Sequence, residues 1–194
     1  MGLFDIFSKK SKTVKSNIEY IVPKSLSEYI LTNMFYFSVC KSKDEMKVIS
    51  QLILTSSNEI KPFYKFRQDV QKIYPDSNCD LLEREYNLAV ACAMIIPKAV
   101  EFESDGDRYN WKLSGYEECE IVLPPNDPFW DKFYPPNDWT DNRFFVVQVR
   151  KGKYKESDSK QAIKYMEKKV DPLFQYDFRK KRFPIDHFIN ALNQ

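Results

Sequence analysis

The stretch that decides the fold is Leu123-Pro-Pro-Asn-Asp-Pro-Phe-Trp-Asp-Lys-Phe-Tyr-Pro-Pro-Asn-Asp-Trp139, in which five prolines alternate with aromatic residues and three aspartates. Proline lacks a backbone N–H and fixes φ, so this pattern suits neither a helix interior nor a central strand. We therefore predict an ordered loop. Its aromatic side chains carry too much apolar area to stay in water, so they either fold back onto the core or contact a partner.

Short strands are expected on both sides of this loop. Tyr109-Asn-Trp-Lys-Leu113 and Glu120-Ile-Val-Leu123 precede it, and Phe144-Phe-Val-Val-Gln-Val-Arg150, which follows it, is the clearest strand pattern in the chain. A basic and polar turn comes next. We then expect a helix from Ser159 to Val170 and a short one after Pro184.

Helical patterns fill the chain before the loop. Two capping boxes, Ser25-Leu-Ser-Glu28 and Ser42-Lys-Asp-Glu45, each precede apolar residues at helical spacing. Pro62 suits the first turn of a third helix, and Asp80 is expected to cap a long fourth helix that is interrupted at Pro97. The expected helical spans are 25–35, 42–53, 62–74 and 81–96.

These elements predict an α+β protein: an N-terminal helical layer packed on a small β-sheet, with the long proline- and aromatic-rich loop crossing the sheet. A single domain over residues 21–194 is expected after a flexible basic tail at residues 1–20. Within the domain we expect three regions, which are a helical part at 25–103, strands and loop at 104–150, and C-terminal helices at 159–192.

Composition narrows the function classes. The chain has 30 basic and 28 acidic residues, and a net charge of +2 favours neither nucleic acid nor an anionic membrane as a general partner. The four cysteines are widely spaced, which is typical of a reducing compartment, and no run of 18 apolar residues predicts a membrane span. Leu3, Ile6 and Phe7 precede several lysines, so the tail is either solvated or anchored on a membrane surface.

The two proline and aromatic motifs, Leu123-Pro-Pro-Asn-Asp-Pro-Phe-Trp130 and Tyr134-Pro-Pro-Asn-Asp-Trp139, resemble the signature loop of the phage Mu F-like minor head proteins, the head morphogenesis family. Residues 82–93 resemble the helix that precedes this loop in the family, and residues 145–149 resemble the strand that follows it. Weaker matches lie at residues 62–70 and 183–187. The resemblance spans roughly residues 35–190 in family order.

The chain departs from the family pattern at its polar positions. Asp138 stands where the family has glycine, and residues 140–145 replace a Cys-x-Cys pair. The family also has an Asp, Arg and His cluster before the first motif, whereas no histidine lies between Asp107 and Leu123 here. Because a structural metal site would need such cysteines and histidines, we expect neither a metal nor a cofactor. The sequence resembles a diverged copy that keeps the scaffold and lacks the polar centre.

Catalytic machinery is not expected, so the chain is interpreted as a non-enzyme. His187 is the sole histidine of the sequence, and among apolar neighbours a packed, hydrogen-bonded role is favoured over catalysis. Four aspartates near the loop are better explained as turn and cap residues than as metal ligands. These are Asp127, Asp131, Asp138 and Asp141.

With catalysis not expected, we predict that the protein acts by binding other macromolecules. A partner-binding surface is expected on the loop, formed by Trp130, Phe133, Tyr134, Pro135, Pro136 and Trp139. A basic run is a weaker candidate for DNA contact, with a solvated charged turn as the alternative. It consists of Arg179, Lys180, Lys181 and Arg182.

The resemblance implies a minor head protein that assists phage head assembly through contacts with portal and capsid proteins. The alternative is an immunity or adaptor protein of a phage-derived toxin or secretion system, built on a degenerate copy of the domain, because family members can carry toxin domains. Either hypothesis predicts a location in the bacterial cytoplasm or in the phage virion.

Overall fold

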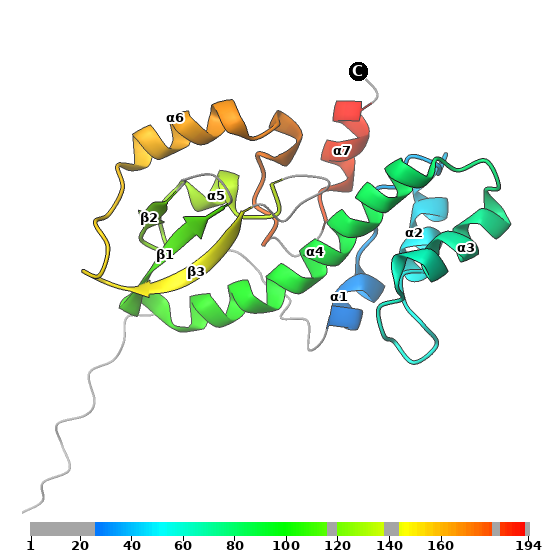
Figure 1. Cartoon of the computed structure of the whole chain (residues 1–194), viewed down its shortest axis with the longest axis horizontal. Helices are drawn as coiled ribbons and strands as arrows, with labels where there is room; N and C mark the ends of the chain where they lie inside the picture. Colours follow the sequence, from blue (N-terminus) through cyan, green and yellow to red (C-terminus); the bar gives the residue numbers. More distant parts are fainter. Residues whose placement is uncertain (1–25, 116–119, 138–143, 180–182, 193–194) are drawn as a thin grey trace, which may run out of the picture.

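The computed structural model describes residues 26–115, 120–137, 144–179 and 183–192 (Figure 1). The predicted tail at residues 1–20 and the cap residue Ser25 lie outside this part of the chain. The helices are α1 (Leu26–Thr32), α2 (Lys43–Gln51), α3 (Phe63–Ile73), α4 (Cys79–Ser104), α5 (Trp130–Phe133), α6 (Ser159–Lys169) and α7 (Ile185–Leu192). The strands are β1 (Tyr109–Ser114), β2 (Ile121–Leu123) and β3 (Phe145–Arg150).

The strands form an antiparallel sheet in the order β2-β1-β3. Each predicted strand is confirmed to within a residue at its ends, and the predicted α+β class is confirmed. Trp111 of β1 lies opposite Leu123 of β2 and Gln148 of β3, which places the three side chains on one face. Since Trp111 and Leu113 are fully buried, this face of the sheet is the core face.

Local cap chemistry accounts for the start of two helices. The Ser42 side chain accepts a hydrogen bond from the Glu45 N–H at 3.2 Å, as the capping box predicts, and α2 begins at the next residue. The cap of α4 differs from the prediction. Asn78, and not Asp80, accepts hydrogen bonds from the backbone at the start of the helix.

The interruption predicted at Pro97 is wrong, because α4 runs without a break from Cys79 to Ser104. Proline removes one backbone donor from a helix interior, which is a local cost. Ala93 and Ala99 are fully buried on either side of Pro97, so tertiary packing holds both halves of the helix in line.

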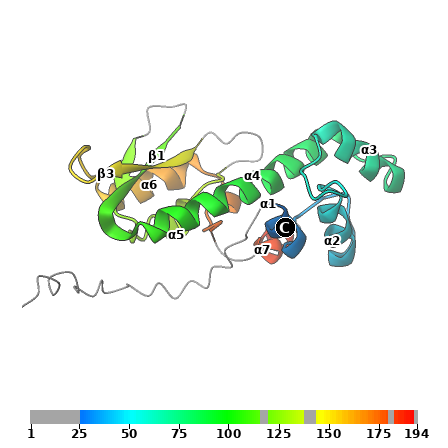
Figure 2. The ribbon, with the colours of Figure 1, turned by 90° about the horizontal axis from the view of Figure 1, so that it is seen from below.

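Helix α4 runs from one group of elements to another (Figures 1 and 2). Helices α1 and α3 contact α4, and α2 contacts α1, whereas the sheet lies beside the C-terminal part of α4. There the Phe102 ring packs 6.4 Å from Trp111, measured between centroids. Within the predicted N-terminal helical layer, α4 is the helix that lies beside the sheet. The helices α5 and α6, which come later in the chain, also pack near the sheet.

One cluster of buried side chains nonetheless connects both groups. It extends from Ile30 and Phe66 near the N-terminal half of α4 to Trp111 in the sheet and Met166 in α6. None of the helices in the described ranges is long and apolar enough to cross a membrane.

Candidate functional site

The loop that follows β2 turns inward. Trp130, Phe133 and Tyr134 are buried, and a short helix, α5, forms at a place where the sequence predicted none. The Trp130 ring meets Trp111 of β1 edge-on with centroids 5.5 Å apart, and its Nε1–H donates to the Pro124 carbonyl oxygen at 2.9 Å. The loop thus contributes aromatic side chains to the core beside the sheet.

This burial corrects the predicted partner-binding surface. Trp130, Phe133, Tyr134, Pro135 and Pro136 are all buried by the chain itself, so none of them presents a surface to a partner. Of the two outcomes that the sequence left open, core is the right one for these five residues. The physical reason is the shape of β1, whose Trp111 and Leu113 leave an apolar face that the loop covers. Trp139 lies outside the described residues.

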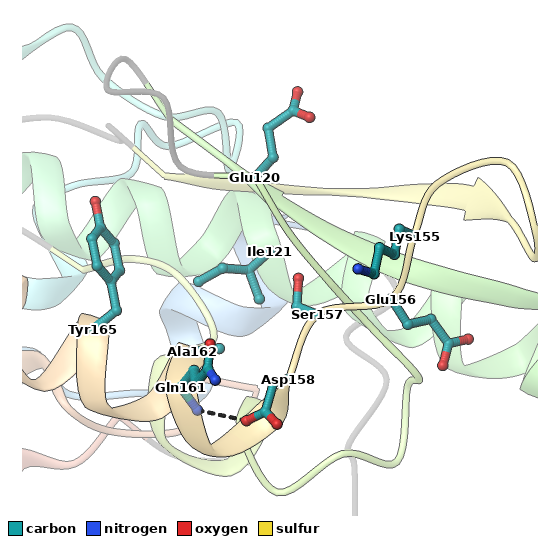
Figure 3. A pocket seen from close by; sticks show the side chains of 9 residues that line it. All are labelled: Glu120, Ile121, Lys155, Glu156, Ser157, Asp158, Gln161, Ala162 and Tyr165. Atoms are coloured by element: carbon teal, nitrogen blue, oxygen red, sulfur yellow. Dashed lines mark hydrogen bonds between the residues drawn. The ribbon is translucent and has the colours of Figure 1, made fainter.

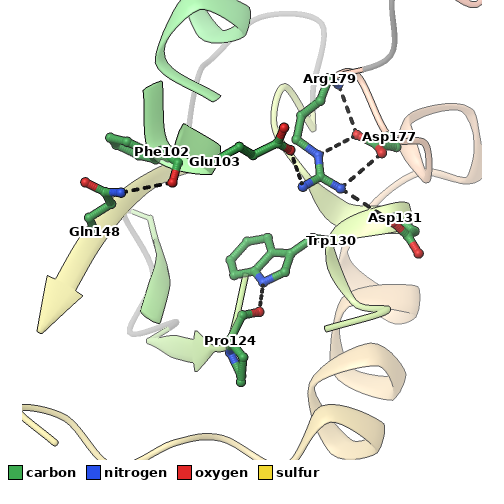
Figure 4. Close-up of polar contacts among 8 residues, drawn as sticks. All are labelled: Phe102, Glu103, Pro124, Trp130, Asp131, Gln148, Asp177 and Arg179. Atoms are coloured by element: carbon green, nitrogen blue, oxygen red, sulfur yellow. Dashed lines mark hydrogen bonds and ion pairs between the residues drawn. The ribbon is translucent and has the colours of Figure 1, made fainter. Parts of the chain in front are cut away.

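A buried charged cluster lies beside these aromatic rings (Figure 4). Asp177, which has no exposed surface, holds the Arg179 guanidinium through two oxygens, with Nε–Oδ1 at 2.8 Å and Nη2–Oδ2 at 3.1 Å. The Arg179 backbone N–H also donates to Asp177 Oδ1, at 3.0 Å. Glu103 of α4 and Asp131 of α5 add weaker ion pairs to the same guanidinium, at 3.4 and 3.5 Å.

The guanidinium also packs on aromatic faces. Its carbon lies 5.4 Å from the Trp111 ring and 5.0 Å from the Tyr134 ring, which is the geometry of cation–π contacts. Burial raises the pKa of Tyr134 well above its usual value, so the ring stays neutral beside the cation. The Arg179 cluster, defined as Arg179, Asp177, Glu103 and Asp131, therefore joins three separate segments of the chain: α4, α5 and the stretch that holds Asp177 and Arg179.

This geometry corrects the predicted nucleic-acid contact at Arg179. Only 3% of the residue is exposed and its charge is paired with carboxylates, so it does not face a phosphate backbone. Lys180, Lys181 and Arg182 lie outside the described residues. The sequence predicted no polar centre, whereas the structure has one, formed by Arg179 and acidic side chains. Asp177 and Glu103 were missed because nothing local to them signals burial.

The buried carboxyl of Glu85, on the first turns of α4, lines a separate pocket of about 220 Å³. Its Oε1 accepts the Ser38 N–H at 2.8 Å, whereas its buried Oε2 has no hydrogen-bond partner within the described residues. Burial raises the pKa of Glu85 to about 7, and hydrogen bonds from Ser38 oppose that rise. The sequence pattern hid this residue within an ordinary helical stretch.

A larger, open groove of about 920 Å³ lies between β2 and the start of α6 (Figure 3). Its three acidic side chains already have partners. Asp158 caps α6 by accepting the Gln161 N–H at 2.9 Å, Glu156 accepts from Asn110 at 2.7 Å, and Glu120 pairs with Lys112. These three carboxylates of the groove are therefore already used in contacts within the chain.

The sequence-predicted catalytic and metal candidates do not converge in the described residues. The Nε2 of His187 lies 3.0 Å from the Leu173 carbonyl oxygen, and the ring stacks on Tyr176 at 5.8 Å. Asp127 accepts hydrogen bonds from the Phe129 N–H and from the Ser159 hydroxyl, as a turn residue does. No group of three or more His, Cys, Asp or Glu side chains in the described part could hold a metal ion. Asp138 and Asp141 lie outside it.

Comparisons with protein-family models, with curated proteins and with solved structures found no match to this chain.

Proposed function

We propose that this chain is a non-enzymatic protein related to phage head morphogenesis, which acts through protein–protein contacts during head assembly. The observation that carries the proposal is the pair of proline and aromatic motifs between residues 123 and 139, with a long helix before and a strand after them. The order of helix, loop and strand is the one that the family resemblance implies. Fold-level order alone would be weak support, because unrelated functions share folds.

The packing of the motif adds a physical reason for its retention. Leu123, Trp130 and Tyr134 lie in one core cluster with β1 and α4, so the motif supplies much of the apolar interior under the sheet. The chain needs this motif in order to fold, whatever partner the folded protein binds. The burial of these residues is therefore a reason to seek the proposed contact surface on other parts of the molecule.

One of the two edge strands of the sheet, β3, is a surface where such contacts can form. Strand β3 is at the edge, and Phe145 at its start leaves 52% of its area in water. Edge strands and exposed aromatic side chains are common elements of protein interfaces. On α3, Tyr64 and Ile73 are about equally exposed.

The decisive experiment is affinity purification of the tagged chain from its native cell, with and without prophage induction, followed by mass spectrometry. Portal and capsid proteins that co-purify only after induction support the proposal, as does the presence of the chain in purified particles. Absence of the chain from particles, together with an unchanged set of partners on induction, refutes it.

An immunity or adaptor role is the second candidate, favoured by the replacement of the family's Cys-x-Cys pair at residues 140–145. A chain that has lost this part of the motif has lost one feature of a working head protein. This role predicts a single toxin-like or secretion partner that co-purifies without induction, in a complex of defined stoichiometry. Size-exclusion chromatography of the purified complex measures that stoichiometry directly.

A further inference from the structure

The pocket around Glu85 has features of a ligand site. Its walls come from residues 38–39, from residues 76–78 and from the start of α4, and Glu85 in this lining has only 4% of the residue exposed. Its lining residues are Ser38, Val39, Asp76, Ser77, Asn78, Leu82 and Glu85. The pocket lies far from the Arg179 cluster along α4, because Glu85 is near one end of the helix and Glu103 near the other.

Two polar atoms in this pocket lack partners. Glu85 Oε2 and Ser77 Oγ are both buried and have no hydrogen-bond partner among the residues that the structure describes. Burying a carboxylate oxygen without a donor is costly, so native structures normally satisfy such atoms with a ligand, an ion or water. The neighbouring cap is already complete, because the Asn78 side chain accepts from the N–H groups of Asp80 and Leu81. The orphaned acceptors are therefore not explained by the folding of the helix end.

A partner that supplies hydrogen-bond donors and positive charge would satisfy the ionised Glu85 carboxylate. We propose that this pocket binds a primary alkylammonium group, either of a free amine or of a lysine side chain. An ammonium has three N–H donors and no acceptor, and the pocket offers acceptors on Glu85, Ser77 and Asp76. Val39 and Leu82 provide apolar wall for the alkyl stem, as lysine stems require.

Size and charge support this class. A pocket of about 220 Å³ is smaller than the roughly 300–1,000 Å³ of sites for drug-sized ligands, and it suits a single short chain. A bare divalent cation fits less well, because no group of three or more metal-ligating side chains is found in the described residues. The site is independent of the proposed function, since a free amine would occupy it without any partner protein.

Protonation of Glu85 should control binding. The titratable groups that face Glu85 are Tyr36 and Cys40, from the segment before α2, and Asp76 in the pocket lining. Burial raises the pKa of Tyr36 and brings that of Cys40 to about 12, so both stay neutral between pH 6 and 8. Glu85 ionises within this interval, and only its ionised form attracts a cation.

The test is an NMR titration of the full chain with n-butylammonium chloride at pH 8, with n-butanol as the uncharged control ligand. We expect saturable shifts of the Ser77, Leu82 and Glu85 amides that butanol does not produce. Glu85→Gln should weaken binding at least tenfold, and Glu83→Gln, on the exposed side of the same helix, should leave it unchanged. Binding to the wild-type chain should weaken several-fold at pH 6.

Absence of saturable shifts, or equal binding by Glu85→Gln, would overturn the proposal and leave water as the occupant. If Glu85→Gln fails to fold, Ser77→Ala and the pH series on the wild-type chain give the same decision. Nα-acetyl-lysine methylamide distinguishes the two sources. Tighter binding of this compound than of butylammonium identifies a lysine side chain, and weaker binding identifies a free amine.

Discussion

Replacement of Arg179 by methionine should destabilise the protein strongly, because it leaves the Asp177 carboxylate buried without its cation. Methionine keeps an apolar stem of similar length, so loss of charge is the main change. Breaking a buried ion pair by removing one partner typically costs about 3–5 kcal/mol. Asp177 has no exposed surface and directs both oxygens to the guanidinium, so we expect Arg179→Met to fall in that range.

Urea unfolding followed by tryptophan fluorescence measures this cost. An unchanged dependence of the unfolding free energy on urea concentration shows that the substitution alters neither the folded nor the unfolded state. Arg108→Met is the matched control. Arg108 pairs with Asp105 at the surface, where its side chain is 67% exposed, and such pairs contribute at most about 1 kcal/mol. Near-equal costs for the two variants would contradict the assignment of Arg179 as a buried, charge-paired residue.

A double variant isolates the charge. In Asp177→Asn with Arg179→Met, the buried carboxylate is gone, so part of the loss should be recovered. We expect the double variant to be more stable than Arg179→Met alone by about 1 kcal/mol or more, although it carries an additional substitution. A double variant that is less stable than Arg179→Met would refute the reasoning, because it would mean that the remaining carboxylate carries no penalty.

Three other predictions concern separate parts of the molecule. Folding raises the pKa of Glu85 from 4.5 to about 7, so the folded state binds this proton more tightly than the unfolded state. The free energy of unfolding should therefore fall by up to about 3 kcal/mol from pH 4.5 to 8. Urea titrations at each pH measure this decrease, and Glu85→Gln should remove it. Trp130→Ala should cost about 3–5 kcal/mol by cavity formation, and a folded, stable variant in thermal unfolding would show that the loop is not core. Ser42→Ala should cost about 1 kcal/mol through loss of the α2 cap, whereas Ser42→Asp should keep most of the stability in the same assay.

Elements that depend on neighbouring residues in the chain were predictable from sequence. The α2 cap, the start of α3 after Pro62 and the strand at β3 all follow from patterns within a few residues. The ends of elements were less predictable. Helix α1 ends at Thr32 although the apolar pattern continues to Phe35, because Phe35 turns into the core and its N–H donates to Ser50 Oγ at 2.8 Å.

The fate of the proline and aromatic loop could not be decided from local pattern. Proline content correctly excluded a long helix or a central strand, but burial of Trp130 depends on Trp111 of β1, a residue 19 positions earlier in the sequence. The same holds for Pro97, where packing on both sides overrides the local preference for a break.

The charged sites show most clearly which features follow from local sequence and which depend on the tertiary structure. Residue types alone placed Arg179 in an exposed basic run, either a DNA contact or a solvated turn, because a run of arginine and lysine is usually exposed. Tertiary structure places its side chain against Glu103, 76 residues earlier, and Asp131, 48 residues earlier. Short-range patterns thus indicated most of the helices and all three strands, but neither α5 nor the continuity of α4. Which side chains lose their water is decided only when distant segments meet, since desolvation depends on every neighbour in space.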